Sequence, residues 1–320
     1  MRQKMSLEQP EKIYRYRGFS EYTVDSLCMD QLYFANPNSF NDPMDCQPTI
    51  ESDSDNIELR TILSELIKNR VKAETLSTLK FAKINIQNSN KYACNLATKN
   101  VNDELARISY YATNPEYEEQ GTSTEEAENW LLLCEIRKEI LNKYNKGVCC
   151  FSSSYKSSLL WSHYGDQHQG LCIGYSLNRN PKPILNKVIY NDNRVLNTSL
   201  IAQAILQSDL YAKKQLDDCV LLRKATPWEY EDEWRIFDSV GLNDSPLAMT
   251  DITFGLRCPS SIMHTIINAL KDRSDGIEFY QMHQISGSYK LRREPVDGET
   301  SSYFPRTSRS GTEIFGHIDK

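Results

Sequence analysis

The chain has 320 residues, of which 39% are hydrophobic and 25% charged. These values are typical of a globular protein that can bury a substantial core. The chain carries 37 Lys and Arg against 43 Asp and Glu, a formal net charge of −6. This balance excludes attraction of nucleic acid through the overall charge, although it does not exclude a local basic patch.

The sequence carries no sign of membrane insertion, secretion or a metal site. No apolar run approaches the roughly 18 residues of a membrane-spanning helix, and the polar residues 1–17 lack the apolar core of a signal peptide. The nine cysteines are an odd number without CxxC spacing, which indicates reduced thiols. We therefore predict a cytoplasmic protein with no membrane partner and no bound metal.

Helical and strand-like patterns come in blocks along the chain. Helix-type spacing of apolar residues extends from about residue 56 to 145. Within this block, Thr122 with Glu125 and Ser123 with Glu126 are capping-box pairs. We predict strands at 12–17, 32–35, about 147–154, 170–175, 188–190, 233–237, 251–255, 279–285 and 289–291, and helices at about 197–222 and from Pro259.

This order of elements predicts the α+β class. We expect a mixed, mainly antiparallel sheet core with the helical block inserted at about residues 56–145. Residues 1–294 should form a single domain. The Ser-, Thr-, Arg- and Gly-rich tail over residues 295–320 should be loosely ordered.

The first candidate cluster is the run Tyr14-Arg15-Tyr16-Arg17. In an alternating strand both arginines point to one face and both tyrosines to the other. Two arginines on one face can bind a phosphate or a carboxylate. The alternative is an edge strand with a solvated basic face.

The second cluster is the loop Phe40-Asn-Asp-Pro-Met-Asp45. Asn41 and Asp42 precede a proline, a pattern typical of turns that are organised by their own side chains. Alternatively, Asp42 and Asp45 hold a ribose hydroxyl, a cation or one of the arginines.

The third cluster places the hydroxyls of Ser152, Ser153 and Ser154 shortly before Trp161 and His163-Tyr164. His163 could be a general base, and a serine a nucleophile or a hydrogen-bonding group. No Gly-x-Ser-x-Gly motif supports a hydrolase of the common type. The aromatic rings could pack in the core or stack on a planar ligand, so we interpret this segment as one wall of a composite pocket.

The fourth cluster is the acidic and aromatic run at residues 228–235. Alternation predicts that Glu231, Glu233 and Arg235 share one face of a strand. These charges could form a surface ladder. Alternatively, the surrounding aromatic residues exclude water from the carboxylates, as happens in active sites.

In this order, the clusters resemble the bacterial domain-of-unknown-function family twenty-nine seventy-one, which also resembles abortive phage-infection proteins. The resemblance extends to about residue 290 and is interrupted by the helical block. It rests on the Tyr14–Arg17 run, Phe40-Asn-Asp-Pro-Met-Asp45, Cys150-Phe-Ser152, Trp161-Ser-His-Tyr164 with Gly170, and Trp228-x-Tyr-Glu-x-Glu-Trp-Arg235.

A second resemblance links an arginine on the opening strand, a serine segment and a Glu-x-Glu motif to Arg-Ser-Glu-type ADP-ribosyltransferases. It implies an ADP-ribosyltransferase-like core in which Arg17 or Arg15 binds NAD. Glu233 would stabilise the cationic transition state of nicotinamide release, and Glu231 would position the acceptor. The residues expected around NAD are Arg17, Arg15, Ser152, Ser153, Trp161, Tyr164, Asn41, Asp42 and Arg235, with Glu233, Glu231 and His163 as catalytic candidates.

These resemblances imply a bacterial defence or toxin-like protein that uses NAD to modify an unknown macromolecular acceptor, or that consumes NAD. A second hypothesis is a hydrolase or nuclease built on His163, Asp42 and Asp45 together with Glu231 or Glu233, with or without a divalent cation. A third is a non-catalytic sensor that recognises a phage component or a nucleotide.

Overall fold

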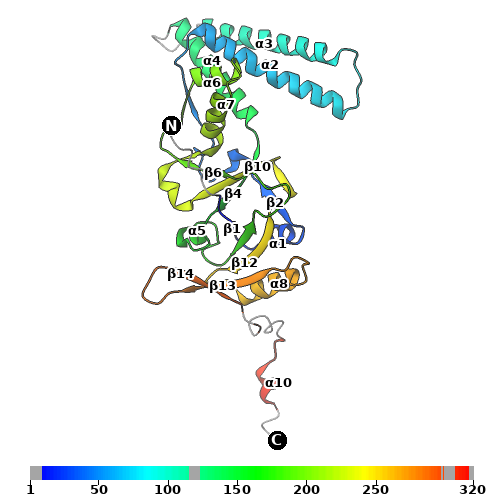
Figure 1. Ribbon diagram of the computed structural model, residues 1–320, viewed down its shortest axis with the longest axis vertical. Helices are drawn as coiled ribbons and strands as arrows, with labels where there is room; N and C mark the ends of the chain where they lie inside the picture. The colour runs from blue at the N-terminus through cyan, green and yellow to red at the C-terminus, as the bar shows by residue number, and fades with distance from the viewer. Residues whose placement is uncertain (1–8, 115–122, 297, 299–306, 317–320) are drawn as a thin grey trace. The chain divides into compact units, whose positions relative to one another are not determined.

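The computed structural model describes residues 9–114, 123–296, 298 and 307–316 (Figure 1). It confirms the α+β class. The chain divides into two compact units, where the sequence predicts one domain. Unit 1 is drawn from residues 1–34, 148–187 and 229–320, and unit 2 from residues 35–147 and 188–228. Unit 2 therefore contains the helical block together with a second, later segment.

Unit 1 is built on an eight-stranded sheet with the order β14-β13-β12-β5-β1-β4-β10-β6. β12 and β13 pair in parallel, whereas the pairs β1–β5, β5–β12 and β13–β14 are antiparallel, so the predicted mixed, mainly antiparallel sheet is confirmed. Its strands are β1 (Lys12–Arg17), β4 (Gly147–Ser152), β5 (Leu171–Ser176), β6 (Asn186–Lys187), β10 (Glu233–Asp238), β12 (Ala248–Phe254), β13 (Glu278–Gln284) and β14 (Leu291–Pro295).

β1 lies in the interior of this sheet, between β5 and β4. The alternative of an edge strand with a solvated basic face is therefore wrong. The predicted alternation along β1 is confirmed, because Ile13 packs in one core cluster while Tyr14 and Tyr16 pack in another. An interior strand is flanked by neighbours on both sides, so its polar side chains can reach solvent only above or below the sheet.

Helices pack on both faces of the sheet (Figure 1). Side chains of α1 (Glu21–Cys28) and α8 (Ser260–Leu270) pack against one face, which we call the α8 face. Leu160 and Trp161 of the short helix α5 (Ser158–His163) pack against the other, which we call the α5 face. A two-stranded ribbon, β2 (Gln31–Phe34) with β11 (Gly241–Asp244), completes the α8 side.

Several predicted boundaries in unit 1 need correction. α5 forms where we expected only a pocket wall, because the Ser157 hydroxyl accepts a hydrogen bond from the Leu160 backbone N–H and starts a helical turn. Pro259 is the N-cap of α8 instead of its first residue. In the predicted tail, residues 311–315 form the short helix α10 (Gly311–Phe315). The remaining tail residues at 297, 299–306 and 317–320 lie outside the described part of the chain.

Unit 2 contains the predicted helical block as three long helices, α2 (Asn56–Phe81), α3 (Ser89–Thr113) and α4 (Thr124–Lys143). The capping box at Ser123 and Glu126 is confirmed, whereas Thr122 lies outside the described residues. The predicted helix at 197–222 is divided into α6 (Thr198–Ile205) and α7 (Leu210–Asp217), the latter continued by a π-helix to Leu222. Short parallel pairs join β3 (Thr49–Glu51) to β8 (Val195–Asn197) and β7 (Ile189–Tyr190) to β9 (Arg223–Lys224).

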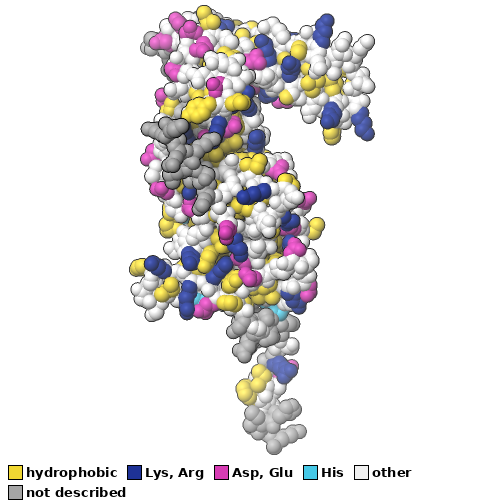
Figure 2. Space-filling view, viewed as in Figure 1, with side chains coloured by type: hydrophobic (Ala, Val, Ile, Leu, Met, Phe, Trp, Pro, Cys, Tyr) yellow, Lys and Arg dark blue, Asp and Glu magenta, His cyan; other side chains and the backbone are white. Residues whose placement is uncertain are grey.

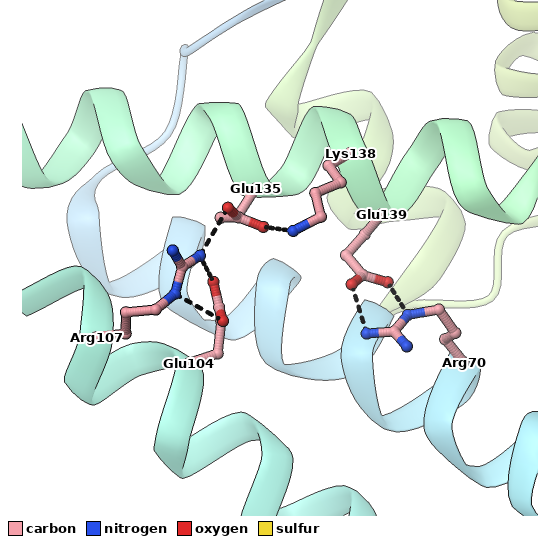
Figure 3. Close-up of polar contacts among 6 residues, drawn as sticks. All are labelled: Arg70, Glu104, Arg107, Glu135, Lys138 and Glu139. Atoms are coloured by element: carbon pink, nitrogen blue, oxygen red, sulfur yellow. Dashed lines mark hydrogen bonds and ion pairs between the residues drawn. The ribbon is translucent and has the colours of Figure 1, made fainter.

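Ion pairs connect the three long helices (Figure 3). Both carboxylate oxygens of the buried Glu139 on α4 accept hydrogen bonds from Arg70 on α2, at 2.7 and 2.8 Å. Arg107 on α3 bonds to Glu135 on α4 at 2.8 Å. A forked pair around a buried carboxylate specifies how two helices align. None of the helices in the described part of the chain has the length and apolar character needed to span a bilayer.

Candidate anion-binding site

β1 presents two arginines to the α8 face of the sheet. Arg15 lies opposite Ile173 of β5, and Arg17 lies opposite Leu171. Residues directly opposite each other in an antiparallel pair share a face, and both partners belong to the core cluster on the α8 face. The alternation of β1 therefore places the two guanidinium groups side by side.

The arginines line a cavity of about 560 Å³ in unit 1, which we call the arginine pocket. Its volume falls in the range of small-molecule sites. α1, β2, β5 and β11 contribute the other walls. Its lining residues are Arg15, Arg17, Ser20, Tyr22, Thr23, Ser26, Leu27, Gln31, Leu32, Tyr33, Ile173, Tyr175 and Leu242.

The positive charge in this pocket is not balanced by its lining. Arg15 donates a hydrogen bond to the Tyr33 backbone carbonyl at 2.9 Å, and its guanidinium lies 5.9 Å from the centre of the Phe151 ring. Among the described residues, the Arg17 side chain makes no hydrogen bond or ion pair, and no Asp or Glu lines the cavity. The charge of Arg15, together with burial, lowers the pKa of Arg17 to about 10.

This arrangement is suited to an anionic ligand that carries a ring. An anion placed between the guanidinium groups would accept charge-assisted hydrogen bonds and would relieve their mutual repulsion. Tyr22 and Tyr33 are exposed at the cavity, and Tyr175 is buried, so aromatic surface is available beside the charge. Leu27, Leu32, Ile173 and Leu242 supply apolar surface.

The other predicted site residues of unit 1 lie on the α5 face. Ser152 lies opposite Tyr14 in the β1–β4 register, and Tyr14 packs on the α5 face. Glu233 and Arg235 flank Trp234, whose side chain belongs to the core on the α8 face, so they point to the opposite side. The sheet therefore lies between Arg17 and Glu233, and the structure does not bring Arg17, Ser152 and Glu233 into one pocket.

Glu233 and Arg235 form a buried forked pair. The Arg235 Nε donates to Glu233 Oε1 at 2.7 Å, and its Nη2 donates to Oε2 at 3.3 Å. The two residues are 3% and 0% exposed. Both oxygens of this carboxylate are already engaged by a neighbour on the same strand.

The alternation predicted that Glu231 and Glu233 share one face of a strand. This prediction is wrong, because Glu231 lies before the strand. It ends the 3₁₀ helix η4 (Thr226–Glu231), before β10 begins, and its Oε1 accepts a hydrogen bond from the Tyr164 hydroxyl at 2.8 Å. The intervening Asp232 has a φ of 41°, which turns the chain between the two glutamates. Asp232 pairs with Lys187 at 3.2 Å and bonds to the Ser153 hydroxyl.

The predicted aromatic wall is partly a core element. Trp161 is fully buried, donates its indole N–H to the Tyr155 carbonyl at 2.9 Å and meets the Tyr16 ring edge-on at 5.1 Å. It therefore packs and does not present a stacking surface. His163 is exposed, with its ring centre 6.4 Å from that of Tyr230. No serine or carboxylate among the described residues lies within hydrogen-bond distance of His163.

Unit 2 holds the second cluster. Asp42 accepts hydrogen bonds from the Met44 backbone N–H at 2.9 Å and from Trp228 Nε1 at 3.0 Å. The first bond confirms that Asp42 organises the turn itself. Asp45 is buried and lies 3.7 Å from Lys224, whereas Asn41 is exposed. Within the described residues, no group of three His, Cys, Asp or Glu side chains is arranged to hold a metal ion.

The sequence analysis did not predict the three tyrosines that line the arginine pocket, Tyr22, Tyr33 and Tyr175. Tyr175 lies opposite Ile13 in the β1–β5 register, a relation that strand alternation alone cannot reveal. Tyr22 follows Ser20, the N-cap of α1. That N-cap pattern, directly after a strand that carries two arginines, is the one local signal that could have indicated a polar pocket at this point.

The comparisons with known proteins support the family resemblance over part of the chain. Residues 160–236 match the model of a family described as "Protein of unknown function (DUF2971)". The matched segment extends from α5 through β5 into β10. Neither the curated proteins nor the solved structures contain a match to this chain.

Proposed function

We propose that this protein binds an anionic nucleotide in the arginine pocket, and that NAD is the first ligand to test. One observation carries the proposal: two arginines on an interior strand share a cavity whose described lining contains no carboxylate. Folded proteins seldom leave such charge uncompensated unless a ligand neutralises it.

The shape and composition of the pocket favour a nucleotide over a simple anion. A phosphate alone would fill a small part of a cavity of about 560 Å³. A nucleotide combines phosphate oxygens for Arg15 and Arg17 with a ring that can lie against Tyr22 or Tyr33. The hydroxyls of Thr23 and Ser26 on α1 donate to backbone carbonyls, and their oxygens can still accept hydrogen bonds from a ribose.

The geometry favours a protein that binds the nucleotide without catalysing a reaction on it. ADP-ribosyl transfer would need a carboxylate close to the nicotinamide ribose. Glu233, the candidate for that role, lies on the α5 face and is bound by Arg235. We therefore propose a nucleotide sensor, and the resemblance to abortive-infection proteins suggests phage defence as its setting.

Calorimetric titration with NAD and with ADP tests this function. Arg17→Met should weaken binding by about tenfold or more, because a hydrogen bond to a charged group contributes roughly 1.5–3 kcal/mol. Glu233→Gln should leave the affinity unchanged, since the sheet separates this residue from the pocket. Arg257→Met, which removes an exposed arginine outside the cavity, is the matched control.

Two results would contradict the proposal. The first is the absence of measurable binding of either nucleotide to the folded protein. The second is NAD-dependent nicotinamide release that disappears in Glu233→Gln, which would establish the transferase instead. Circular dichroism of each variant verifies its folding, because Glu233→Gln alters a buried ion pair.

A further inference from the structure

The α2–α3 hairpin of unit 2 extends beyond the region where three helices pack together. α4 contacts α2 through the pairs Glu128–Arg60 and Glu139–Arg70. The buried residues of α2 end at Val71, and those of α3 begin at Ala93. Residues 72–92 therefore form the end of a two-helix hairpin (Figure 1), and none of their side chains is buried.

The hairpin from residue 66 to residue 102, which includes this end, is basic, in contrast to the acidic protein as a whole. Between residues 66 and 102 the only acidic residue is Glu74. Among the described residues, none of the lysines in this segment makes an ion pair or a side-chain hydrogen bond. We call it the lysine hairpin after these residues, which are Lys68, Lys72, Lys80, Lys83, Lys91 and Lys99.

The lysines are distributed along the hairpin and do not form a single point of charge. Lys68 and Lys80 are twelve residues apart on α2, which corresponds to about 18 Å along a helix at 1.5 Å per residue. Figure 2 shows dark-blue side chains spaced along this hairpin and grouped near its end. An extended row of cations matches a polyanion with regularly repeated charges.

The side chains between the lysines are amides and exposed rings. Asn85, Gln87, Asn88 and Asn90 are all exposed, and they can donate hydrogen bonds to phosphate and sugar oxygens. Phe81 is 90% exposed and Tyr92 is 48% exposed. Such rings can lie against sugars or unpaired bases.

We infer that the lysine hairpin binds the phosphodiester backbone of a nucleic acid. An anionic membrane surface is the competing partner for a basic segment with exposed apolar side chains. The amides weigh against it, because their hydrogen bonds would be lost on insertion below the headgroups. The lysines also extend along both helices instead of bordering one apolar face. This inference is independent of the arginine pocket.

Fluorescence anisotropy with labelled DNA and RNA duplexes tests the inference on the full chain. The test variant combines Lys80→Gln, Lys83→Gln and Lys91→Gln. The control variant combines Lys182→Gln, Lys271→Gln and Lys290→Gln, which changes the net charge equally at exposed lysines outside the hairpin.

For whichever duplex the wild type binds more tightly, we expect the affinity of the test variant to be at least about tenfold lower. The affinity of the control variant should stay close to that of the wild type. The slope of log K against log salt should fall by about 3, since each phosphate contact contributes roughly 0.9. An equal loss in both variants would show that only the overall charge matters and would overturn the inference. So would the absence of duplex binding at low salt, whether or not phosphatidylserine vesicles bind.

Discussion

Replacing Arg17 by methionine tests whether this residue serves to bind a ligand or to stabilise the fold, because the two roles predict opposite changes in the stability of the free protein. Methionine retains an unbranched apolar stem but removes the charge that Arg15 repels. If the arginine pair exists to hold a ligand, the free protein should become more stable when one charge is removed. If Arg17 instead supports the fold, the same variant should be less stable.

The pKa of Arg17 indicates the size of this effect. It falls from 12.5 to about 10 because of the nearby Arg15 and because of burial. Arg17 is charged in both the folded and the unfolded chain at neutral pH, so the lower pKa corresponds to an upper limit of about 3 kcal/mol of lost stability. Partial solvent exposure screens this repulsion, so we expect Arg17→Met to raise the free energy of unfolding by about 1–2 kcal/mol.

The pH dependence has a definite sign. A cation whose pKa is lower in the folded state destabilises the fold at every pH below that value, and the effect disappears as the pH rises from about 10 towards 12.5. The stability advantage of the variant should therefore be constant from neutral pH to about pH 9 and shrink above it.

Thermal unfolding of the wild type, Arg17→Met and Arg257→Met measures this. We expect the midpoint of Arg17→Met to rise by roughly 2–8 °C, at 2–4 °C per kcal/mol. The surface variant Arg257→Met should stay near the wild type. Added NAD should stabilise the wild type more than Arg17→Met. A lower midpoint for Arg17→Met in the free protein would refute the proposed role of the arginine pair.

Three further predictions concern packing and thiols. Arg70→Met should lower the free energy of unfolding in urea by about 3 kcal/mol because it leaves the Glu139 carboxylate buried and unpaired. The double variant with Glu139→Leu should recover most of that loss, and no recovery would contradict the explanation. Ser123→Ala should cost about 1 kcal/mol in the same assay through loss of the capping box; an unchanged midpoint would mean that the cap is dispensable. Exposed Cys28 should react with a thiol reagent in the native protein, whereas Cys149, whose pKa is raised by burial, should react only after unfolding; equal native rates by mass spectrometry would disagree with the structure.

Much of the local structure follows from the order of residues alone. Alternation along residues 12–17 correctly separates the two arginines from the two tyrosines, and Ser123 with Glu126 correctly marks the start of a helix. Both rules operate between residues a few positions apart, so they hold wherever the segment lies in the fold. The α+β class follows in the same way, from blocks of helical and strand-like periods.

The strand order and the assignment of faces depend on contacts between residues that are far apart along the chain. The same alternation that orients Arg17 also orients Glu233, but it cannot say whether two distant strands point these side chains to one face of the sheet. Trp234 belongs to the core cluster on the α8 face, and this places the neighbouring Glu233 on the α5 face. The pairing of β1 with β5 brings Tyr175 to the arginines, and the described lining of their cavity contains no carboxylate that would neutralise them. The local sequence thus places two arginines on one face of a strand, and long-range packing brings the other walls of the pocket around them.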